Sequence, residues 1–513
     1  MSRINSNTPS MIAQFNLARS NDNLQVRLNR LATGVRINRG GDDPAGLIIS
    51  ERISTDINGV EQAIKNGERA SSVISTTEAS LAEVNSLLNS IKALVVEAAN
   101  TGGNSKEERD ANQLQIDSAI RSITRISNTA TFGGLNLLDG SLDYVTSGVN
   151  SSQISKAQIS GASFIGTTQL QVEVDVLNSA QKGALFMEPG VGPLSATGTT
   201  SSMTLQIGGS RGILEIDVTS GQTFQTIVDA VNQRTSLTGV TASLVNGNAN
   251  SGVVFNAENY GSSSFVSVER VNTPAGEAGP NLYKFGNNEA LNATFAFTDT
   301  GLVTANRDSG RDVIALVNGA LANGDGLTIS TNSPILSSQL TLAESFAIDP
   351  TITASTFDII GGGSMYQLGP EVSALQQENI GVQSMAASKL GGTLDNGVMQ
   401  FLSSLQSGGV NDLEASLQRN DFSTASDIID TSIDDVTIIR GRLGAFERNV
   451  LDTNKRSLQA AVENLSASRS VIRDADFAVE TSELTRAQIL ASSSTTVLGL
   501  ANQQAQSVLQ LLG

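Results

Sequence analysis

The side chains that could do chemistry in this chain are carboxylates, hydroxyls, amides and amines, because its 513 residues include no Cys and no His. These absences remove thiolate nucleophiles, imidazole bases and the usual ligands of transition metals. A Ser nucleophile would need a Lys or a carboxylate to activate it, and residues 165–400 contain no recognisable pair of this kind and no metal motif. Asn323–Gly326 has too few acidic ligands for a calcium loop and is typical of a turn. We predict no enzyme activity, cofactor or metal site; an enzymatic domain inserted in the middle is the alternative.

The charge balance narrows the class of partner. The chain has 32 Lys and Arg against 50 Asp and Glu, and this excess of acid disfavours binding to nucleic acid and to anionic membranes. No stretch approaches the roughly 18 apolar residues of a membrane helix, and Met1–Ser20 lacks the pattern of a secretory signal peptide. Charged residues make up only 16% of the chain. A surface so poor in charge suits contact with neighbouring copies, or sugar attached to Ser and Thr.

The elements that would carry any function are long helices near the two ends of the chain. Apolar residues recur at alternating steps of three and four over Ile53–Ala98 and again over Ile433–Ile472. Such a stripe needs a partner helix, and the most economical partner for each stripe is the other one. We therefore predict a coiled-coil rod. The residues assigned to its core are Ile57, Ile64, Leu81, Leu88, Val436, Leu443, Val450 and Leu465. The polar residues in the stripes either set the register of the rod or are merely tolerated; they are Ser71, Glu78, Asn454 and Ser468.

The two extreme ends differ from the rod. Residues 1–38 form a weakly amphipathic helix, which ends at a Gly-rich break where Asp42 or Asp43 can cap the next helix. Residues 474–513 are apolar around most of a helix and carry no charge after Arg486. A helix of this kind must be buried, so we predict that these ends join copies of the chain. The residues assigned to assembly are Leu24, Leu28, Leu31, Leu484, Ile489, Leu490, Val497, Leu500, Val508 and Leu511.

The middle of the chain changes to a period of two, typical of strands. The pattern predicts a hairpin over 203–218, a helix over 224–231, strands over 240–245, 253–256 and 265–271, a second helix over 313–317, and a short hairpin earlier, over 132–140. The predicted fold is mainly α, with an inserted α+β region that forms β-rich outer domains. We place the terminal helical domain at 1–44 plus 470–513, the rod domain at 45–165 plus 410–469, and the outer region at 166–409, in two modules of about 166–290 and 291–409.

The terminal regions resemble bacterial flagellins. At the N-terminal end the segments that carry the resemblance are Ile4–Asn7, Leu31–Asn38, Asp42–Ser50, Leu94–Asn100, Arg125–Thr129 and Phe132–Leu138. At the other end they are Glu463–Asp476, Glu480–Thr481, Glu483–Thr485, Gln488–Leu490, Ala501–Gln503 and Val508–Leu512. The middle is a weaker match, and includes a β-module around Ile207–Ala242 that is often found in the family.

This resemblance implies a structural subunit that self-assembles into the extracellular flagellar filament for swimming motility. It implies export in an unfolded state through the flagellar type III system. It also implies three kinds of partner besides the chain itself, namely a cytoplasmic export chaperone on the C-terminal helix, the filament cap and the hook-associated proteins. The alternative is a hook–filament junction protein, which shares the split helical plan; the Ile472–Asp476 segment and the Leu-rich end favour the filament subunit.

The resemblance also bears on immune recognition. Some flagellins bind a Toll-like receptor through the long helix near Leu88–Ala98 and the helix after it, and strongly recognised members have Arg and Glu where this chain has Ser90 and Gln115. Leu94 matches those members. We therefore expect weak recognition by this receptor.

Overall fold

The computed structural model of the protein describes residues 7–164, 167–189, 203–219, 222–248, 251–272, 281–286, 297, 301–349, 351, 353–395 and 398–512, with the side chains of 505 and 508–512 left aside. These residues fall into two compact units. The terminal unit consists of Met1–Arg69, Gln367–Gln376 and Arg448–Gly513, and the body unit consists of Ala70–Tyr366 and Gln377–Glu447. Helix α2, Pro44–Ala98, begins in the terminal unit and continues into the body unit.

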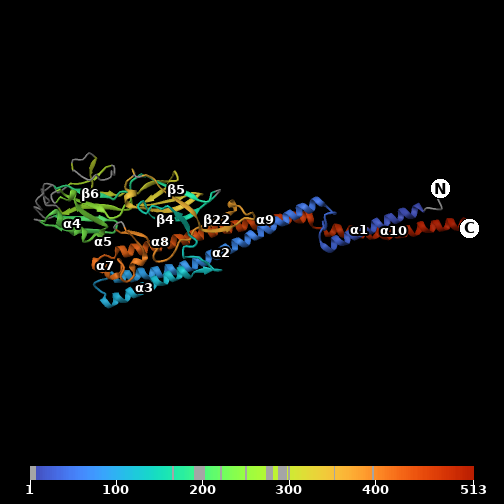
Figure 1. Ribbon diagram of the computed structural model, residues 1–513, viewed down its shortest axis with the longest axis horizontal. Helices are drawn as coiled ribbons and strands as arrows, with labels where there is room; N and C mark the ends of the chain where they lie inside the picture. Colours follow the sequence, from blue (N-terminus) through green and yellow to red (C-terminus); the bar gives the residue numbers. More distant parts are fainter. Residues whose placement is uncertain are drawn as a thin grey trace. The chain divides into compact units, whose positions relative to one another are not determined.

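The predicted combination of terminal helices with a central β-rich region is confirmed (Figure 1). The helices are α1 Thr8–Thr33, α2 Pro44–Ala98, α3 Lys106–Thr129, α4 Phe224–Asn232, α5 Thr235–Thr238, α6 Glu344–Ala347, α7 Leu413–Arg419, α8 Ser423–Phe446, α9 Asp452–Arg473 and α10 Phe477–Leu512. Local sequence signals fix several of their ends. The start of α3 is a capping box, in which Ser105 accepts from the Glu108 N–H while the Glu108 side chain accepts from the Ser105 N–H.

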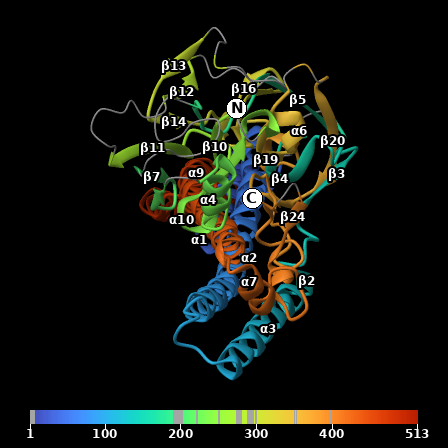
Figure 2. The same ribbon diagram turned by 90° about the vertical axis from the view of Figure 1, so that its left-hand side faces the viewer.

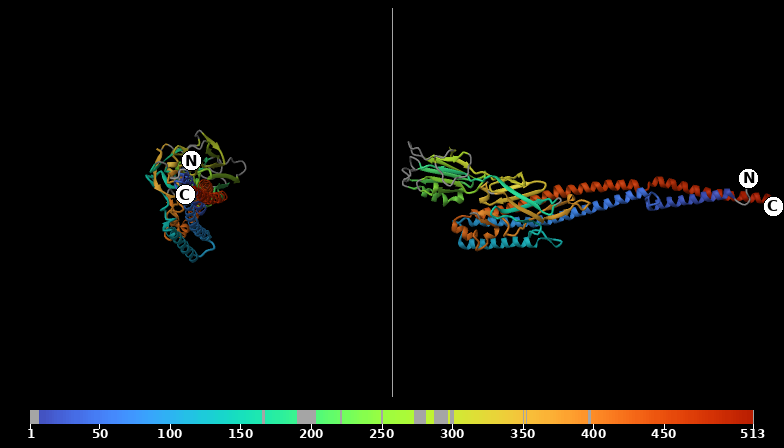
Figure 3. Two further views of the ribbon diagram at one scale, coloured as in Figure 1. Left: turned by 90° about the vertical axis from the view of Figure 1, so that its right-hand side faces the viewer. Right: turned by 45° about the horizontal axis from the view of Figure 1, so that its top comes forward.

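Ion pairs show that the rod helices run antiparallel. In the terminal unit Arg473 pairs with Glu51 at 2.9 Å and Lys455 pairs with Glu68 at 2.8 Å. In the body unit Arg440 lies 3.5 Å from Glu78, and Lys92 pairs with Asp430. The partner's number falls along α9 and α8 as the residue number rises along α2, as antiparallel neighbours require. Figure 3 shows α3 running beside α2 as a further helix of the body unit.

A π-helical turn, Glu447–Leu451, joins α8 to α9. Such a turn inserts a residue into the helical repeat and rotates the face that follows it. The buried apolar residue of this turn is Leu451, whereas Val450 is half-buried. The apolar period of the sequence therefore predicts Val450 as the core residue of this turn, whereas the buried residue is the next one, Leu451.

The strands of the body unit form two β-modules. Their bounds are β3 Tyr144–Ser147, β4 Ile154–Ala162, β5 Leu170–Asn178, β6 Ala184–Met187, β7 Met203–Gly209, β8 Ile213–Val218, β9 Val240–Leu244, β10 Val253–Ala257, β11 Phe265–Asn272, β12 Leu282–Phe285, β13 Leu302–Thr304, β14 Arg307–Ser309, β15 Ile314–Val317, β16 Ala320–Leu321, β17 Asn323–Asp325, β18 Thr328–Asn332, β19 Leu336–Leu342 and β20 Ser355–Gly362. Smaller two-stranded sheets are β1 Thr131–Phe132 with β2 Leu135–Asn136, β21 Ser364–Gln367 with β22 Gln377–Ile380, and β23 Thr393–Asp395 with β24 Val398–Gln400.

Module A holds strands β6 to β14, in sheets of order β13-β12-β6-β10-β9 and β14-β11-β7-β8. Its core combines side chains of both sheets with Phe224, Ile227 and Val231 of α4. Module B holds β3 to β5 and β15 to β20, in sheets of order β16-β15-β5-β20-β3 and β17-β18-β19-β4. In Figure 2 the sheet with β5 and β20 and the sheet with β4 and β19 form separate layers.

The two modules are nested in sequence, and this corrects the predicted division near residue 290. Strand β5 pairs with both β15 and β20. Residues 170–178, which precede module A in the sequence, therefore share a sheet with 314–317 and 355–362, which follow it. At the point of entry the N–H of Gln181 donates to the Arg311 carbonyl and the N–H of Arg311 donates to the Gln181 carbonyl, each at 2.9 Å. The predicted end of the rod domain at residue 165 is also wrong, because β3 and β4 belong to module B.

Most of the local elements predicted in the middle of the chain are confirmed, and some are wrong. The hairpin over 203–218, the helix at α4, the strands β9 to β11 and the short hairpin β1–β2 are confirmed. The helix predicted over 313–317 is wrong, because Ile314–Val317 is strand β15. Its alternating burial, with Ala315 and Val317 inside, is the period-two pattern of a strand. The turn predicted over Asn323–Gly326 is wrong for most of its length, because Asn323–Asp325 is strand β17 and the turn into β18 follows at residues 326–327.

Helix α8 holds the modules of the body unit through polar side chains. Asp435 accepts hydrogen bonds from Lys156 at 3.0 Å and from Gln158 at 3.2 Å, both on β4. Arg211, in the turn between β7 and β8, pairs with Glu258 at 2.6 Å and with Asp427 of α8 at 2.8 Å. Both modules are thus tied to one helix of the rod.

Candidate assembly surface

Hydrogen bonds join the two breaks in the helices of the terminal unit. Helix α1 ends at Gly34, which takes the left-handed conformation with φ 71°. Beyond it, the N–H of Arg36 donates to the Arg473 carbonyl at 2.7 Å, and the N–H of Ala475 donates to the Gly34 carbonyl at 3.0 Å. Val35 and Asp474 form an isolated antiparallel bridge between these bonds. The turn that follows α1 and the turn that precedes α10 are therefore fixed to each other.

Two neighbouring aspartates organise the start of α2, and each has a separate role. Asp43 accepts from the N–H of Gly46 at 2.9 Å, which is the capping bond that the sequence predicts. Asp42 accepts from the N–H groups of Asn38 and Arg39 at 3.0 and 3.1 Å. These two bonds hold the pKa of Asp42 below its ordinary value. The Gly-rich break is thus an ordered turn, in which the two aspartates engage the N–H groups of Asn38, Arg39 and Gly46.

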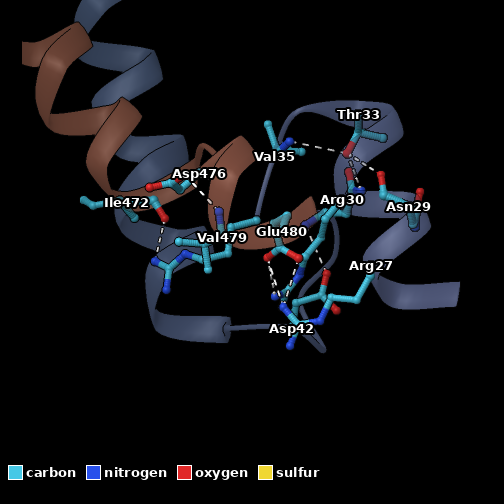
Figure 4. A network of polar contacts seen from close by, with 12 residues as sticks. Arg27, Asn29, Arg30, Thr33, Val35, Asp42, Ile472, Asp476, Val479 and Glu480 are labelled. Carbon is cyan, nitrogen blue, oxygen red and sulfur yellow. Dashed lines mark hydrogen bonds and ion pairs between the residues drawn. The ribbon is translucent and has the colours of Figure 1, made fainter. Parts of the chain in front are cut away.

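A buried carboxylate joins α1 to α10 just beyond these turns (Figure 4). Glu480 is 4% exposed, and it accepts from Arg27 at 2.9 Å and from Arg30 at 3.2 Å. Burial opposes ionisation of this carboxyl, but the hydrogen bonds and charges of the two guanidinium groups outweigh burial and hold the pKa of Glu480 below its ordinary value. The cluster fixes the register in which α10 lies against α1.

Farther along, α1 and α10 run antiparallel and approach each other through small side chains (Figures 1 and 3). The buried residues of this pair include Ser10, Ala13, Ala487 and Ala491. Ser10 Oγ donates to Asn502 Oδ1 at 2.8 Å, and Asn7 Nδ2 donates to the Ala501 carbonyl at 3.2 Å. Small residues bury little apolar area, so this contact contributes little of the hydrophobic stabilisation that a Leu or Ile core provides.

Most of the large apolar side chains that the structure describes on the same two helices are exposed. In the terminal unit as the structure describes it, more than 45% of the surface of each of these side chains is exposed: Met11, Ile12, Phe15, Leu28, Ile489, Leu490, Val497 and Leu500. Of the other residues assigned to assembly, Leu24, Leu31 and Leu484 are half-buried. The side chains of Val508 and Leu511 lie outside the described residues. Exposed apolar surface on this scale indicates a docking surface for protein.

Met11, Ile12 and Phe15 were missed by the sequence reasoning, although a signal for them exists. They are large apolar residues at the start of a helix that is otherwise rich in Asn, Ser and Arg. The small buried residues were missed as well, because Ala and Ser at helical spacing carry no distinct hydrophobic signal. Glu480 has no signal in the sequence besides its place in a family motif, and its partners Arg27 and Arg30 lie 453 and 450 positions away in sequence.

The residues assigned to the rod core have a different environment. Leu81, Leu88, Val436, Leu443 and Ile57 are each at most 4% exposed, whereas Ile64, Val450 and Leu465 are half-buried. Three of the four polar residues in the stripes contact another segment of their own unit. Ser71 donates to Glu447, Glu78 pairs with Arg440, and Asn454 donates to the Leu368 carbonyl. Ser468 donates to the Asn464 carbonyl of its own helix.

Two kinds of feature are not found in the described part of the chain. Across residues 7–512, excluding the gaps named above, no three or more acidic side chains gather where they could hold a metal ion. None of the described helices is both long enough and apolar enough to cross a membrane.

Comparison with known proteins identifies the chain. A model of the bacterial flagellin N-terminal helical region matches residues 4–143, and a model of the C-terminal helical region matches residues 426–512. Flagellin of Salmonella choleraesuis is 28% identical over 99% of both chains, and the B-type flagellin of Pseudomonas aeruginosa is 27% identical over the same share. The chain belongs to the bacterial flagellin family. A flagellin is a structural protein, and this one is a subunit of the extracellular flagellar filament.

The family models align with the elements described here. The N-terminal match runs from before α1 to the end of the β1–β2 region, and the C-terminal match covers nearly all of α8 to α10. A model of the flagellin hook IN motif matches residues 202–259, which include β7 to β10 and α4 of module A. The module that the sequence placed around Ile207–Ala242 is thus confirmed as a flagellin motif.

Solved structures give weaker likenesses. FliC from Burkholderia pseudomallei is 12% identical, with a TM-score of 0.23, over 74% of this chain and 99% of that chain. The flagellar junction protein from Legionella pneumophila is also 12% identical, with a TM-score of 0.28, over 83% and 99%. Scores this low do not favour the junction protein, and the curated relatives named above are flagellins.

Proposed function

We propose that this flagellin joins its neighbours in the filament through α1 and α10, whereas the helices of the body unit hold each subunit together. The observation that carries the proposal is the inversion of packing between α1 and α10. Ala13, Ala487 and Ala491 face inward, and Phe15, Ile489 and Leu500 face outward. An antiparallel pair that leaves its largest apolar side chains in water gains most by lying against further helices.

We further propose that α1 and α10 are largely unfolded in the free subunit and fold when it is added at the tip. Ordering a residue costs about 1–2 kcal/mol of backbone entropy, and a contact between small side chains offsets little of that cost. Burial between neighbouring copies supplies the rest. A head-to-tail contact that does not close into a ring continues as a helix of subunits. Terminal segments that fold late also fit export through the flagellar type III system in an unfolded state.

The same surface supports a cytoplasmic export chaperone as a partner. Before export, α10 would expose Ile489, Leu490, Val497 and Leu500, with no charge after Arg486 to keep it in solution. A chaperone that covers this helix would prevent premature polymerisation. The filament cap and the hook-associated proteins are proposed as partners at the two ends of the polymer. We propose no catalytic activity for the chain.

For the Toll-like immune receptor we propose weak recognition. Ser90 of α2 and Gln115 of α3 are exposed, and the Ser90 hydroxyl donates to the Ser86 carbonyl of its own helix. A short hydroxyl and a neutral amide replace the Arg and Glu of strongly recognised flagellins. Purified monomer should activate receptor-bearing cells poorly, and the double variant Ser90→Arg with Gln115→Glu should activate them more strongly. Strong activation by the unaltered monomer would contradict this proposal.

The assembly proposal is tested by removing residues 474–513. Purified full-length chain should elongate sheared filament seeds, and the truncated chain should not. The β-modules of the truncated chain should retain their cooperative melting, since the deleted residues lie outside the body unit. If the truncated chain elongated seeds as well as the intact chain, α10 would not be the joining element.

A further inference from the structure

One short segment of the terminal unit is flanked in the sequence on both sides by the body unit. Strands β21 and β22 form a hairpin, and the residues at its end, Gln367–Gln376, belong to the terminal unit. We call these ten residues, 367–376, the bracket loop. The Asn66 side chain of α2 donates to the Gln367 carbonyl at 3.2 Å, and the Asn454 side chain of α9 donates to the Leu368 carbonyl at 2.7 Å. The loop therefore bridges both rod helices.

Close packing adds to these bonds. Leu368 is 5% exposed, so the first apolar residue of the loop is buried. Pro370 lies against Gly59 of α2, where an added Cβ would stand 3.2 Å from the Cβ of the proline. The approach is close enough that an alanine at position 59 would press on the loop. The base of the bracket loop is thus held to the rod by two hydrogen bonds from Asn side chains and by the packing of Pro370 against Gly59.

The loop is also rigid internally. The N–H of Leu368 donates to the Gln376 carbonyl at 2.9 Å, and the N–H of Glu371 donates to the Gln376 side chain at 2.7 Å. Gln367 Nε2 donates to the carbonyls of Gly369 and Glu371 at 2.9 and 2.7 Å. With its backbone so closed, the loop loses little further conformational entropy when its outer side binds something.

That outer side is apolar. Val372 is 90% exposed and Leu375 is 81% exposed, among the highest values for large apolar side chains in the described part of the chain. They lie three positions apart on a loop that is held at both ends. A rigid loop that buries Leu368 and presents two branched side chains to water has the character of a preformed contact.

We infer that the bracket loop is a second subunit-to-subunit contact, in which Val372 and Leu375 are covered by a neighbouring copy of this chain. The inference rests on the proposed assembly through α1 and α10. The loop belongs to the same compact unit as those helices, so the copies that are proposed to cover α1 and α10 dock on the unit that presents Val372 and Leu375. Every subunit in the filament also meets copies of itself at the highest local concentration of any partner. The contact lies outside α1 and α10, and its loss should weaken the polymer without abolishing it.

Thiol protection tests the contact directly, because the chain contains no cysteine. A Val372→Cys variant should react with a maleimide dye at least tenfold more slowly in filaments than as free subunits. Leu321→Cys, on the exposed edge strand β16, is the matched control and should react at similar rates in both forms. Equal rates at position 372 in the two forms would overturn the inference. So would protection that appears only after other flagellar proteins are added to filaments of the pure chain.

A charge variant measures the strength of the contact. Val372→Asp with Leu375→Asp should leave the far-UV circular dichroism of the free subunit unchanged and raise the critical concentration for seeded growth at least tenfold. Leu321→Asp should leave that concentration unchanged. If the double variant grew at the wild-type concentration while the chain without residues 474–513 failed to grow, the bracket loop would be excluded and assembly through α10 would stand. Growth of the truncated chain would instead remove the proposed function.

Discussion

The α1–α10 pair and the α2–α8 pair are both antiparallel, yet they are packed in opposite ways. Between α2 and α8 the large residues Leu81, Leu88 and Val436 are fully buried. Between α1 and α10 the buried apolar residues are alanines, and most of the large apolar residues of the described part are exposed. A pair with a Leu and Val core is stable by itself, whereas a pair joined through Ala and Ser needs a neighbour. This difference is the basis of our proposal that the body unit folds by itself and that α1 and α10 join copies of the chain.

The largest expected effect comes from testing both pairs with the same substitution. Leu88→Ala should lower the free energy of unfolding of the body unit by about 2–5 kcal/mol, because it leaves a cavity in a close-packed core. Leu490→Ala should change the stability of the free subunit by less than about 0.5 kcal/mol and should raise the critical concentration for polymerisation. Chemical denaturation and seeded growth measure the two quantities. Equal destabilisation of the free subunit by both variants would break the comparison.

A smaller effect is expected from the buried carboxylate. Glu480→Gln removes a charged partner of two guanidinium groups and should weaken filaments by about 1–3 kcal/mol per subunit, seen as a lower temperature of depolymerisation. Glu483→Gln is the matched control, because Glu483 is more exposed and lies 3.7 Å from the exposed Arg486. A control as damaging as Glu480→Gln would mean that burial of the carboxylate is irrelevant.

The same residue predicts a dependence on acid. The folded pKa of Glu480 is lowered, so its contribution is fully present above the pKa of an unfolded Glu, about 4.3, and is lost as pH falls through the folded value. Filaments should therefore lose stability in this range, as followed by light scattering during titration with acid. Filaments of Glu480→Gln should lose less over the same interval. An identical acid profile for the two would rule out this carboxyl as a source of the loss.

The smallest expected effect is a loss of stability that is confined to the body unit. Ser105→Ala removes the cap of α3 and should cost about 1 kcal/mol of the unfolding free energy of that unit. It should leave the critical concentration for polymerisation unchanged. Ser118→Ala, at an exposed position inside the same helix, should alter neither quantity. An altered critical concentration for Ser105→Ala would show that the two regions are coupled.

The sequence predicts the helices and the family better than it predicts the packing. Period and caps are local, so the rod helices, the turn before α2 and the hairpin of β7 and β8 could be placed from nearby residues. The nesting of the modules could not, because it depends on β5 pairing with strands more than 130 residues away. The helix predicted at 313–317 failed because a short apolar run fits either period, and the sheet decides.

Some features of the assembly surface could be predicted from the sequence and others could not. The exposure of four apolar residues of α10 could be predicted, because this helix is apolar and carries no charge after Arg486; they are Ile489, Leu490, Val497 and Leu500. The pairing of Glu480 with Arg27 and the π-turn before α9 follow only from the folded chain. Val372 and Leu375 lie in a short segment without periodicity, where exposure has no signature in sequence.

The reciprocal hydrogen bonds between Gln181 and Arg311 have a consequence for the replacement of module A by another domain. Module A leaves and re-enters its host at a single point, so its presence adds almost no loop-closure penalty to module B. Strands β5 and β15 would pair in the same way if a short turn replaced everything between those two residues. The position is therefore suited to domain exchange, and a foreign domain inserted there would be carried by every subunit.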